Sequence, residues 1–140
     1  MLRAAGRWNR SGSYGALYLA MTDQGALAER ANAQTAAAAS GLPFGPHDLA
    51  SLAVGLRRAL DFIDRAVCRR FGVRPTDLVG HSSAAYARCW DVADLARAQG
   101  EFVLLVPSAA LPDATNLIVY PEVPPGACSL DVGPDRIPLD

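Results

Sequence analysis

Residues 100–120 read GEFVLLVPSAALPDATNLIVY and carry the clearest structural signals in the chain. The apolar run 102–106 is short, rich in branched side chains and followed by proline, which predicts a buried strand with Ser108 just beyond its end. A second apolar run, 116–120, stops at Pro121 and predicts another strand, because proline cannot continue a sheet ladder. This stretch therefore supplies two strands of the predicted fold.

On the N-terminal side of this stretch, the sequence predicts helices and one more strand. Residues 83–99 predict a helix that stops at Gly100. Residues 16–20 predict a short buried strand, and Thr22 can cap a helix that runs from there to about Ala39.

The middle of the chain admits two interpretations. Apolar residues recur there at three- and four-residue intervals, which favours one long amphipathic helix beginning after Asp48. Gly55 weakens such a helix, and residues 51–56 can instead form a strand ahead of a shorter helix over 61–71. The recurring positions are Leu49, Leu52, Leu56, Leu60, Ile63 and Val67.

The tail after Pro121 is rich in proline and predicts extended chain, with one edge strand over 128–132. Strands thus occur at both ends of the chain, helices lie between them, and β-α-β units do not alternate regularly. This order favours an α+β fold in one compact domain, residues 1–140, over a doubly wound parallel sheet.

Composition narrows the function classes. Of the 140 residues, 51% are hydrophobic and 19% are charged, which is typical of a folded domain and not of a disordered chain. The net charge of −1 gives no general attraction to nucleic acid or to a membrane surface. Three cysteines without a C-x-x-C pair indicate reduced thiols in a cytoplasmic protein, and two distant histidines give no metal-site pattern.

Few residues suggest chemistry by their local pattern. Ser108 lacks the G-x-S-x-G sequence of a hydrolase nucleophile. Arg7 lies in a glycine-flanked loop, Tyr18 on a predicted strand, and Glu29 inside a helix whose other inward positions are Ala and Leu. From the residues alone, Glu29 can equally be an exposed helix residue and Tyr18 a packing residue, so these patterns leave the function open.

Two blocks of the sequence resemble the signatures of the RES domain family, which is named after its Arg, Glu and Ser residues. The first block is Gly6-Arg7-Trp8-Asn9, followed by Gly12, the run 16–20 and Ala26-Leu27-Ala28-Glu29. The second block is 100–109 together with 116–121. The order and spacing of both blocks match the family, and the resemblance covers nearly the whole chain.

The resemblance implies a fold like that of ADP-ribosyltransferase toxins and a toxin of a bacterial RES–Xre type II toxin–antitoxin module. It implies cleavage of the nicotinamide–ribose bond of NAD⁺, by hydrolysis or phosphorolysis, without a metal. It also implies an Xre-family antitoxin as the partner that contacts DNA, and a cytoplasmic location. The alternatives are transfer of ADP-ribose to a specific protein, and a catalytically impaired module that only binds the antitoxin. Relatives usually carry a segment upstream of the first block, so we expect this chain to lack an N-terminal part of the domain.

The same resemblance assigns roles that suit the residue types. A carboxylate stabilises the oxocarbenium character that develops on the ribose during cleavage. An arginine offers a planar fork of donors to a diphosphate or a ribose oxygen, a tyrosine can stack on a base, and a serine can donate to phosphate or ribose. The residues carried over as catalytic are Glu29, Arg7, Tyr18 and Ser108, and those expected to bind NAD⁺ are Arg7, Tyr18, Ser108, Trp8 and Asn116.

Overall fold

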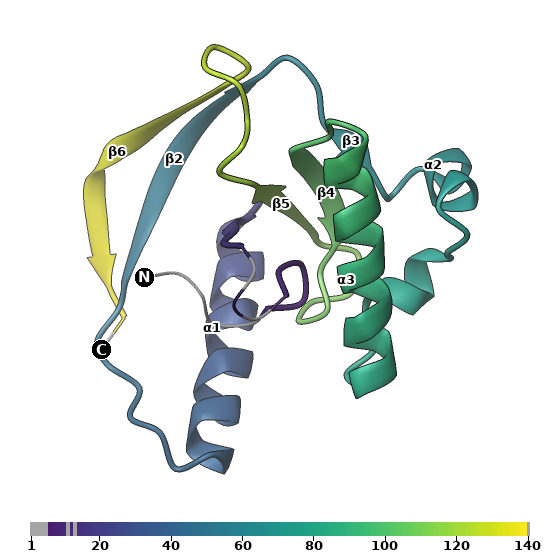
Figure 1. The fold of residues 1–140 in the computed structure, drawn as a ribbon. Coiled ribbons are helices and arrows are strands. Elements are labelled where there is room, and N and C mark those ends of the chain that lie inside the picture. The colour runs from purple at the N-terminus through teal and green to yellow at the C-terminus, as the bar shows by residue number, and fades with distance from the viewer. Residues whose placement is uncertain (1–5, 11, 13, 140) are drawn as a thin grey trace.

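The computed structural model describes residues 6–10, 12 and 14–139, and it contains helices and two separate sheets (Figure 1). The elements in chain order are β1 (Leu17–Ala20), α1 (Asp23–Ala39), β2 (Asp48–Leu56), β3 (Leu60–Asp61), α2 (Arg65–Arg70), a 3₁₀ turn (Pro75–Leu78), α3 (Ser83–Ala98), β4 (Val103–Pro107), β5 (Thr115–Val119) and β6 (Cys128–Pro138). This arrangement confirms the predicted α+β fold.

The central sheet has four strands in the order β1-β5-β4-β3. β5 pairs antiparallel with both β1 and β4, whereas β3 pairs parallel with β4. The two strands predicted from the stretch 100–120 are confirmed as β4 and β5, and they form the middle of the sheet. Because side chains alternate along a strand, Ile118 shares one face with its neighbours Tyr18 and Leu104.

The main core lies on this face of the sheet, under α3 and the loop that precedes β1. α3 begins after Ser82, whose hydroxyl accepts a hydrogen bond from the backbone N–H of Ala85, and the predicted helix over 83–99 is confirmed to within one residue. The largest fully buried side chains of the core are Trp8, Tyr120, Phe62, Leu78, Leu104 and Ile118.

A ribbon of two antiparallel strands, β2 and β6, lies on the other side of the sheet from α3 (Figure 1). The long helix favoured after Asp48 is therefore wrong, and the alternative strand is closer to the structure. A register shift between Ala50 and Leu52 marks a bulge in β6, where residues 133–135 lie opposite the single residue Ser51 of β2. The apolar cross-strand pairs on either side of it are Leu49–Ile137, Leu52–Val132, Val54–Leu130 and Leu56–Cys128.

β6 extends to Pro138 and is therefore longer than the predicted edge strand over 128–132. Gly133 lies in the bulge, where a Cβ would be 3.0 Å from the carbonyl oxygen of Ser51 on the facing strand, so a glycine fits this close approach. The predicted helix over 61–71 is shorter in the structure: Asp61 ends β3, and the carboxylate of Asp64 caps α2 by accepting the N–H of Ala66.

α1 begins close against the edge of the sheet. The hydroxyl of Thr22 caps it by accepting the N–H of Gly25, as predicted. A Cβ at Gly25 would lie 3.1 Å from the capping hydroxyl oxygen of Thr22, so the glycine leaves room for the cap at the start of the helix that carries Glu29. In the described part of the chain, no helix has the length and apolar character to cross a membrane.

Candidate functional site

Three polar side chains from separate elements meet at one carboxylate oxygen, and we call them the carboxylate cluster. The hydroxyl of Ser108 donates to Oε1 of Glu29 at 2.9 Å, and Nδ2 of Asn116 donates to the same oxygen at 2.7 Å. Glu29 comes from α1, Ser108 follows β4 and Asn116 lies on β5. Ser108 and Asn116 are buried, with 6% and 9% of their surface exposed. Residues that are 79 and 87 positions apart from Glu29 thus converge on it.

The turn after β4 fixes the hydroxyl of Ser108. Its oxygen accepts the backbone N–H groups of Ala110 and Leu111, both at 3.1 Å. Its own backbone N–H donates to the carbonyl of Ala114, which closes the hairpin that leads to β5. Because a hydroxyl has one proton and two acceptor positions, these contacts direct the proton toward Glu29. This geometry makes Ser108 a donor to the carboxylate and leaves it no acceptor position for the role of a nucleophile.

The carboxylate of Glu29 is held on one side only. Both hydrogen bonds that the described residues give to this side chain fall on Oε1. The partly buried carboxylate is therefore fixed in position while Oε2 keeps its acceptor capacity. A fixed carboxylate with one unengaged oxygen can accept a ligand hydroxyl or stabilise a nearby positive charge.

Arg7 lies in the loop whose described residues are 6–10, 12 and 14, which we call the N-terminal loop, and only 9% of its surface is exposed. Its Nη1 donates to the carbonyl of Gly80 at 2.6 Å, and its guanidinium carbon lies 4.5 Å from the ring centre of Tyr86. Burial raises the pKa of the Cys89 thiol, and the neighbouring Arg7 guanidinium opposes that shift. The guanidinium is thus fixed against α3 and the segment that precedes it.

Tyr18 connects β1 to the N-terminal loop. Its hydroxyl donates to Oδ1 of Asn9 at 2.5 Å and accepts the backbone N–H of Trp8 at 2.8 Å. A Cβ at Gly6 would collide with the Tyr18 hydroxyl, which explains the glycine before Arg7. Burial of the phenol raises the pKa of Tyr18 to about 12, so the phenol is neutral at physiological pH. Because 41% of the residue is exposed, part of the ring remains available for stacking.

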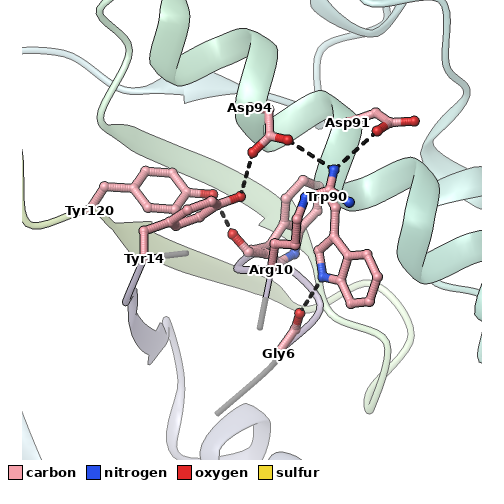
Figure 2. A network of polar contacts seen from close by, with 8 residues as sticks. Gly6, Arg10, Tyr14, Trp90, Asp91, Asp94 and Tyr120 are labelled. Atoms are coloured by element: carbon pink, nitrogen blue, oxygen red, sulfur yellow. Dashed lines mark hydrogen bonds and ion pairs between the residues drawn. The ribbon is translucent and has the colours of Figure 1, made fainter. Parts of the chain in front are cut away.

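A network of polar contacts fastens the other end of the N-terminal loop to α3 (Figure 2). Arg10 pairs with Asp94 at 2.9 Å and with Asp91 at 3.2 Å. The hydroxyl of Tyr14 donates to Asp94 at 2.8 Å, and the indole N–H of Trp90 donates to the carbonyl of Gly6 at 2.7 Å, as Figure 2 shows. These contacts, made from both ends of the loop, hold Arg7 between them.

The structure divides the predicted site residues into two groups. Glu29, Ser108 and Asn116 are in direct contact, whereas Arg7 and Tyr18 belong to the N-terminal loop and its attachments. Among the described residues, no hydrogen bond or ion pair joins the two groups. They nevertheless share a face of the sheet, because Asn116 pairs with Ala20 and Tyr18 lies two positions before Ala20 on β1.

Trp8 lies in the core and anchors the N-terminal loop there. Only 2% of its surface is exposed, and its ring centre is 6.1 Å from that of Phe62. Its carbonyl accepts the buried hydroxyl of Tyr120 at 2.8 Å. Sequence reasoning did not identify the residues that hold Arg7 and the loop: Gly80, Tyr86, Asp91 and Asp94. Neither periodicity nor a short motif indicates these long-range contacts.

A groove of about 610 Å³ separates the β2–β6 ribbon from the central sheet. Leu52, Val54 and Leu117 are among the apolar residues of its walls, and Ala26 lines it one helical turn before Glu29. The described residues that line it include two aspartates, Asp23 and Asp48, and no arginine. A diphosphate is therefore disfavoured in this groove, which borders the carboxylate cluster without containing it. In the described part of the chain, no three His, Cys, Asp or Glu side chains group closely enough to hold a metal ion.

Comparisons with known proteins agree with this architecture. The family model of the RES domain matches residues 1–140. The chain is similar in structure to a chain of the M. tuberculosis MbcT–MbcA toxin–antitoxin complex, with a TM-score of 0.72 and 23% sequence identity, over 99% of this chain and 73% of that chain. No curated protein matched the sequence. At this level of identity, the structural similarity shows a shared fold.

Proposed function

The chain belongs to the RES domain family, and from this membership we propose that it is the toxin of a toxin–antitoxin pair that cleaves the nicotinamide–ribose bond of NAD⁺. The observation that carries the proposal is the convergence of Ser108 and Asn116 on Oε1 of Glu29. The resemblance assigns catalysis to Glu29 and Ser108. The geometry supports a role in which the hydrogen bond from the Ser108 hydroxyl positions the carboxylate of Glu29.

The chemistry of this bond suits a fixed carboxylate. Nicotinamide leaves as a neutral molecule, and positive charge develops on the ribose ring at C1′ and its oxygen. A carboxylate that is already in position stabilises this charge without reorganising during the reaction. Water then forms the new bond to C1′ and loses one proton, so the products of hydrolysis are ADP-ribose, nicotinamide and a proton. Phosphate in place of water gives the phosphorolysis product.

The N-terminal loop supplies the second half of the proposed site. Arg7 places a permanent cation on the same side of the sheet as Glu29, and guanidinium is well suited to a diphosphate. One of its donors is engaged by Gly80, and the remaining donors of the fork are proposed to bind NAD⁺. The exposed part of the Tyr18 ring is proposed to stack on a base of the dinucleotide.

We propose an Xre-family antitoxin as the partner in the cytoplasm. Membership of the RES family supports this pairing, and the similar M. tuberculosis chain comes from a toxin–antitoxin complex. The net charge of −1 agrees with DNA contact being made by the partner.

The proposal is tested by incubating the purified chain with NAD⁺ and measuring free nicotinamide by mass spectrometry, with and without phosphate in the buffer. We expect Glu29→Gln to slow release by roughly 100-fold or more, a typical effect of removing an electrostatic stabiliser from a transition state. The variant keeps the size of the side chain and an oxygen acceptor for Ser108 and Asn116, so its melting temperature should change little.

Glu101→Gln is the matched control, because Glu101 pairs with Arg58 and lies outside the carboxylate cluster. It should release nicotinamide at close to the wild-type rate. If the wild-type protein releases no nicotinamide, the proposed NAD⁺ cleavage is wrong. If both variants release it at the wild-type rate, the proposed role of Glu29 is wrong. Transfer of ADP-ribose to a protein would instead appear as label from NAD⁺ retained on a protein of the lysate.

A further inference from the structure

Arg7 carries a permanent charge that no carboxylate of the described residues balances. Only 9% of the residue is exposed, and its guanidinium is held by the carbonyl of Gly80 and the ring of Tyr86 without an ion pair in the described part of the chain. Charged groups that are largely removed from water are normally paired with an opposite charge. An anionic ligand at this position would balance the charge.

Tyr86 offers a second donor beside this cation. The centre of its ring lies 4.5 Å from the guanidinium carbon of Arg7, and the phenol oxygen is bonded directly to that ring. Among the residues that the structure describes, no hydrogen bond involves the Tyr86 hydroxyl. The residue is half-buried, and its oxygen keeps contact with solvent, because it is not one of the fully buried atoms without a partner. A ligand can therefore reach this donor from the surface.

Arg7 keeps donors at the same place. A guanidinium has five N–H donors, and the hydrogen bond to Gly80 uses Nη1. No guanidinium nitrogen of Arg7 is both fully buried and without a partner among the described residues, so its other nitrogens also contact solvent. A planar fork and a phenol O–H thus lie side by side. Such a set of donors suits an anion with several oxygens, and phosphate matches an arginine fork especially well.

The ring of Tyr86 is fixed by α3 and by Trp90. Its backbone N–H donates to the carbonyl of Ser82 in the first turn of the helix. One turn later, the ring of Trp90 meets the ring of Tyr86 edge to face, with centres 6.4 Å apart and 83° between the planes. The indole N–H of Trp90 also donates to the carbonyl of Gly6, directly before Arg7. These contacts hold the Tyr86 hydroxyl in a constant position relative to Arg7.

Tyr18 lies near this pair of donors. Burial is the main cause of the raised pKa of Tyr18, the phenols of Tyr14 and Tyr86 add to the rise, and Arg7 opposes it. Such electrostatic effects decrease with distance, so Tyr18, Tyr86 and Arg7 are neighbours. In NAD⁺ the diphosphate connects the two nucleosides. A phosphate site next to the ring that is proposed to stack on a base therefore fits the order of groups in the dinucleotide.

We propose that the hydroxyl of Tyr86 donates to the diphosphate of NAD⁺ beside the fork of Arg7, which makes Tyr86 a further substrate-binding residue. This inference rests on the proposed function and adds a second donor to its phosphate site. The ring of Tyr86 supports the guanidinium, whereas its hydroxyl binds the ligand. The charge of the diphosphate does not change while the nicotinamide–ribose bond breaks. The hydroxyl should therefore stabilise bound NAD⁺ and the transition state equally, and its loss should raise KM rather than lower kcat.

Tyr86→Phe tests the hydroxyl alone, because it keeps the ring under Arg7. Its KM for NAD⁺ should rise by roughly tenfold, while kcat stays within about twofold of wild type. Its melting temperature should match that of wild type, because the hydroxyl has no partner among the described residues. Tyr86→Leu is the comparison variant that also removes the ring. It should lower the melting temperature, because Arg7 loses the ring on which it stacks.

Binding of ADP-ribose, measured by isothermal titration calorimetry, tests the same contact without turnover. ADP-ribose contains the diphosphate, so Tyr86→Phe should bind it roughly tenfold more weakly than wild type does. Nicotinamide contains no phosphate, so it should inhibit NAD⁺ cleavage equally in both proteins. Inorganic phosphate is the third probe, and its effect on the rate of nicotinamide release should be the same in both proteins.

Two results would overturn the inference while leaving NAD⁺ cleavage intact. In the first, Tyr86→Phe binds ADP-ribose as tightly as wild type and keeps its KM, so that Tyr86 only supports Arg7. In the second, Tyr86→Phe changes the response to inorganic phosphate alone, so that the hydroxyl binds free phosphate and not the diphosphate of NAD⁺. Failure of the proposed function is distinct. Wild-type protein would then release no nicotinamide, and the binding of ADP-ribose would still report on Tyr86.

Discussion

The carboxylate cluster and the N-terminal loop position their functional groups in different ways. In the cluster, Glu29 is held by two side chains whose backbones belong to the central hairpin of the sheet, and its second oxygen accepts no hydrogen bond from the described residues. In the loop, Arg7 is held by a carbonyl and by an aromatic ring, and the Tyr18 hydroxyl is used at both its donor and its acceptor. The second carboxylate oxygen of the cluster can therefore accept a hydrogen bond from a ligand, whereas many polar groups of the loop form hydrogen bonds that hold the loop itself in place.

This difference predicts how the two regions respond to mutation. Removing a group of the cluster should change the rate of NAD⁺ cleavage far more than the free energy of unfolding. Removing a group of the loop should change both, because the same contacts that position Arg7 also fasten the loop to α3. Within the loop, the expected effects are largest at Arg7.

Arg7→Lys should lower the free energy of unfolding by about 2 kcal/mol and slow nicotinamide release by roughly tenfold or more. The ammonium of lysine is a compact charge without the planar fork of arginine. It cannot both donate to the buried carbonyl of Gly80 and stack on the ring of Tyr86, so one of these contacts is lost. Arg10→Lys is the matched control in the same loop. The Arg10 side chain is 39% exposed and makes ion pairs at the surface, so this change should lower the free energy of unfolding less than Arg7→Lys does. Thermal and urea unfolding measure both variants, and equal losses would contradict the distinction between the buried and the exposed arginine.

Ser108→Ala should slow nicotinamide release by roughly tenfold, because Glu29 loses one of the two donors that fix it, and should cost about 1 kcal/mol of stability. Ser82→Ala is the control matched in stability. Its hydroxyl caps α3 through Ala85, and losing a cap also costs about 1 kcal/mol. Nicotinamide release by Ser82→Ala should stay near the wild-type rate. A comparable loss of rate in both variants would mean that Ser108 acts only through stability.

The parts of the fold that were predictable from sequence are those in which local pattern and tertiary contacts agree. β4, β5 and α3 each combine a clear apolar pattern with a definite stop. The ribbon differs from the favoured prediction because the three-residue spacing of Leu49 and Leu52 is typical of a helix. In β2 this spacing places the two side chains on opposite faces, and each pairs with an apolar residue of β6, Ile137 and Val132, on either side of a bulge in β6.

The site was predictable only as far as the family resemblance reached. Glu29 and Ser108 carry no local signal that separates them from a surface glutamate and a turn serine, and family resemblance identified them. The contacts that hold Arg7 and Tyr14 join residues 73 and 80 positions apart. Such pairs arise from the packing of the loop on α3, which sequence periodicity does not encode.

Tyr14→Phe tests the weakest of the expected effects, the contribution of the network around Asp94. Burial of the phenol, with the Asp94 carboxylate as its hydrogen-bond acceptor, raises the pKa of Tyr14 to about 12 from its usual value near 10. Between about pH 10 and 12, the unfolded chain therefore releases a proton that the folded chain keeps, and the free energy of unfolding falls as pH rises. The chain has no lysine to titrate in this range. Urea unfolding as a function of pH should show a shallower alkaline decline in Tyr14→Phe than in wild type, and a loss of about 1 kcal/mol at neutral pH from the missing hydrogen bond. An unchanged decline would show that the Tyr14 hydroxyl titrates as it does in the unfolded chain, and the loop would then depend on Arg10 and Trp90 for its attachment to α3.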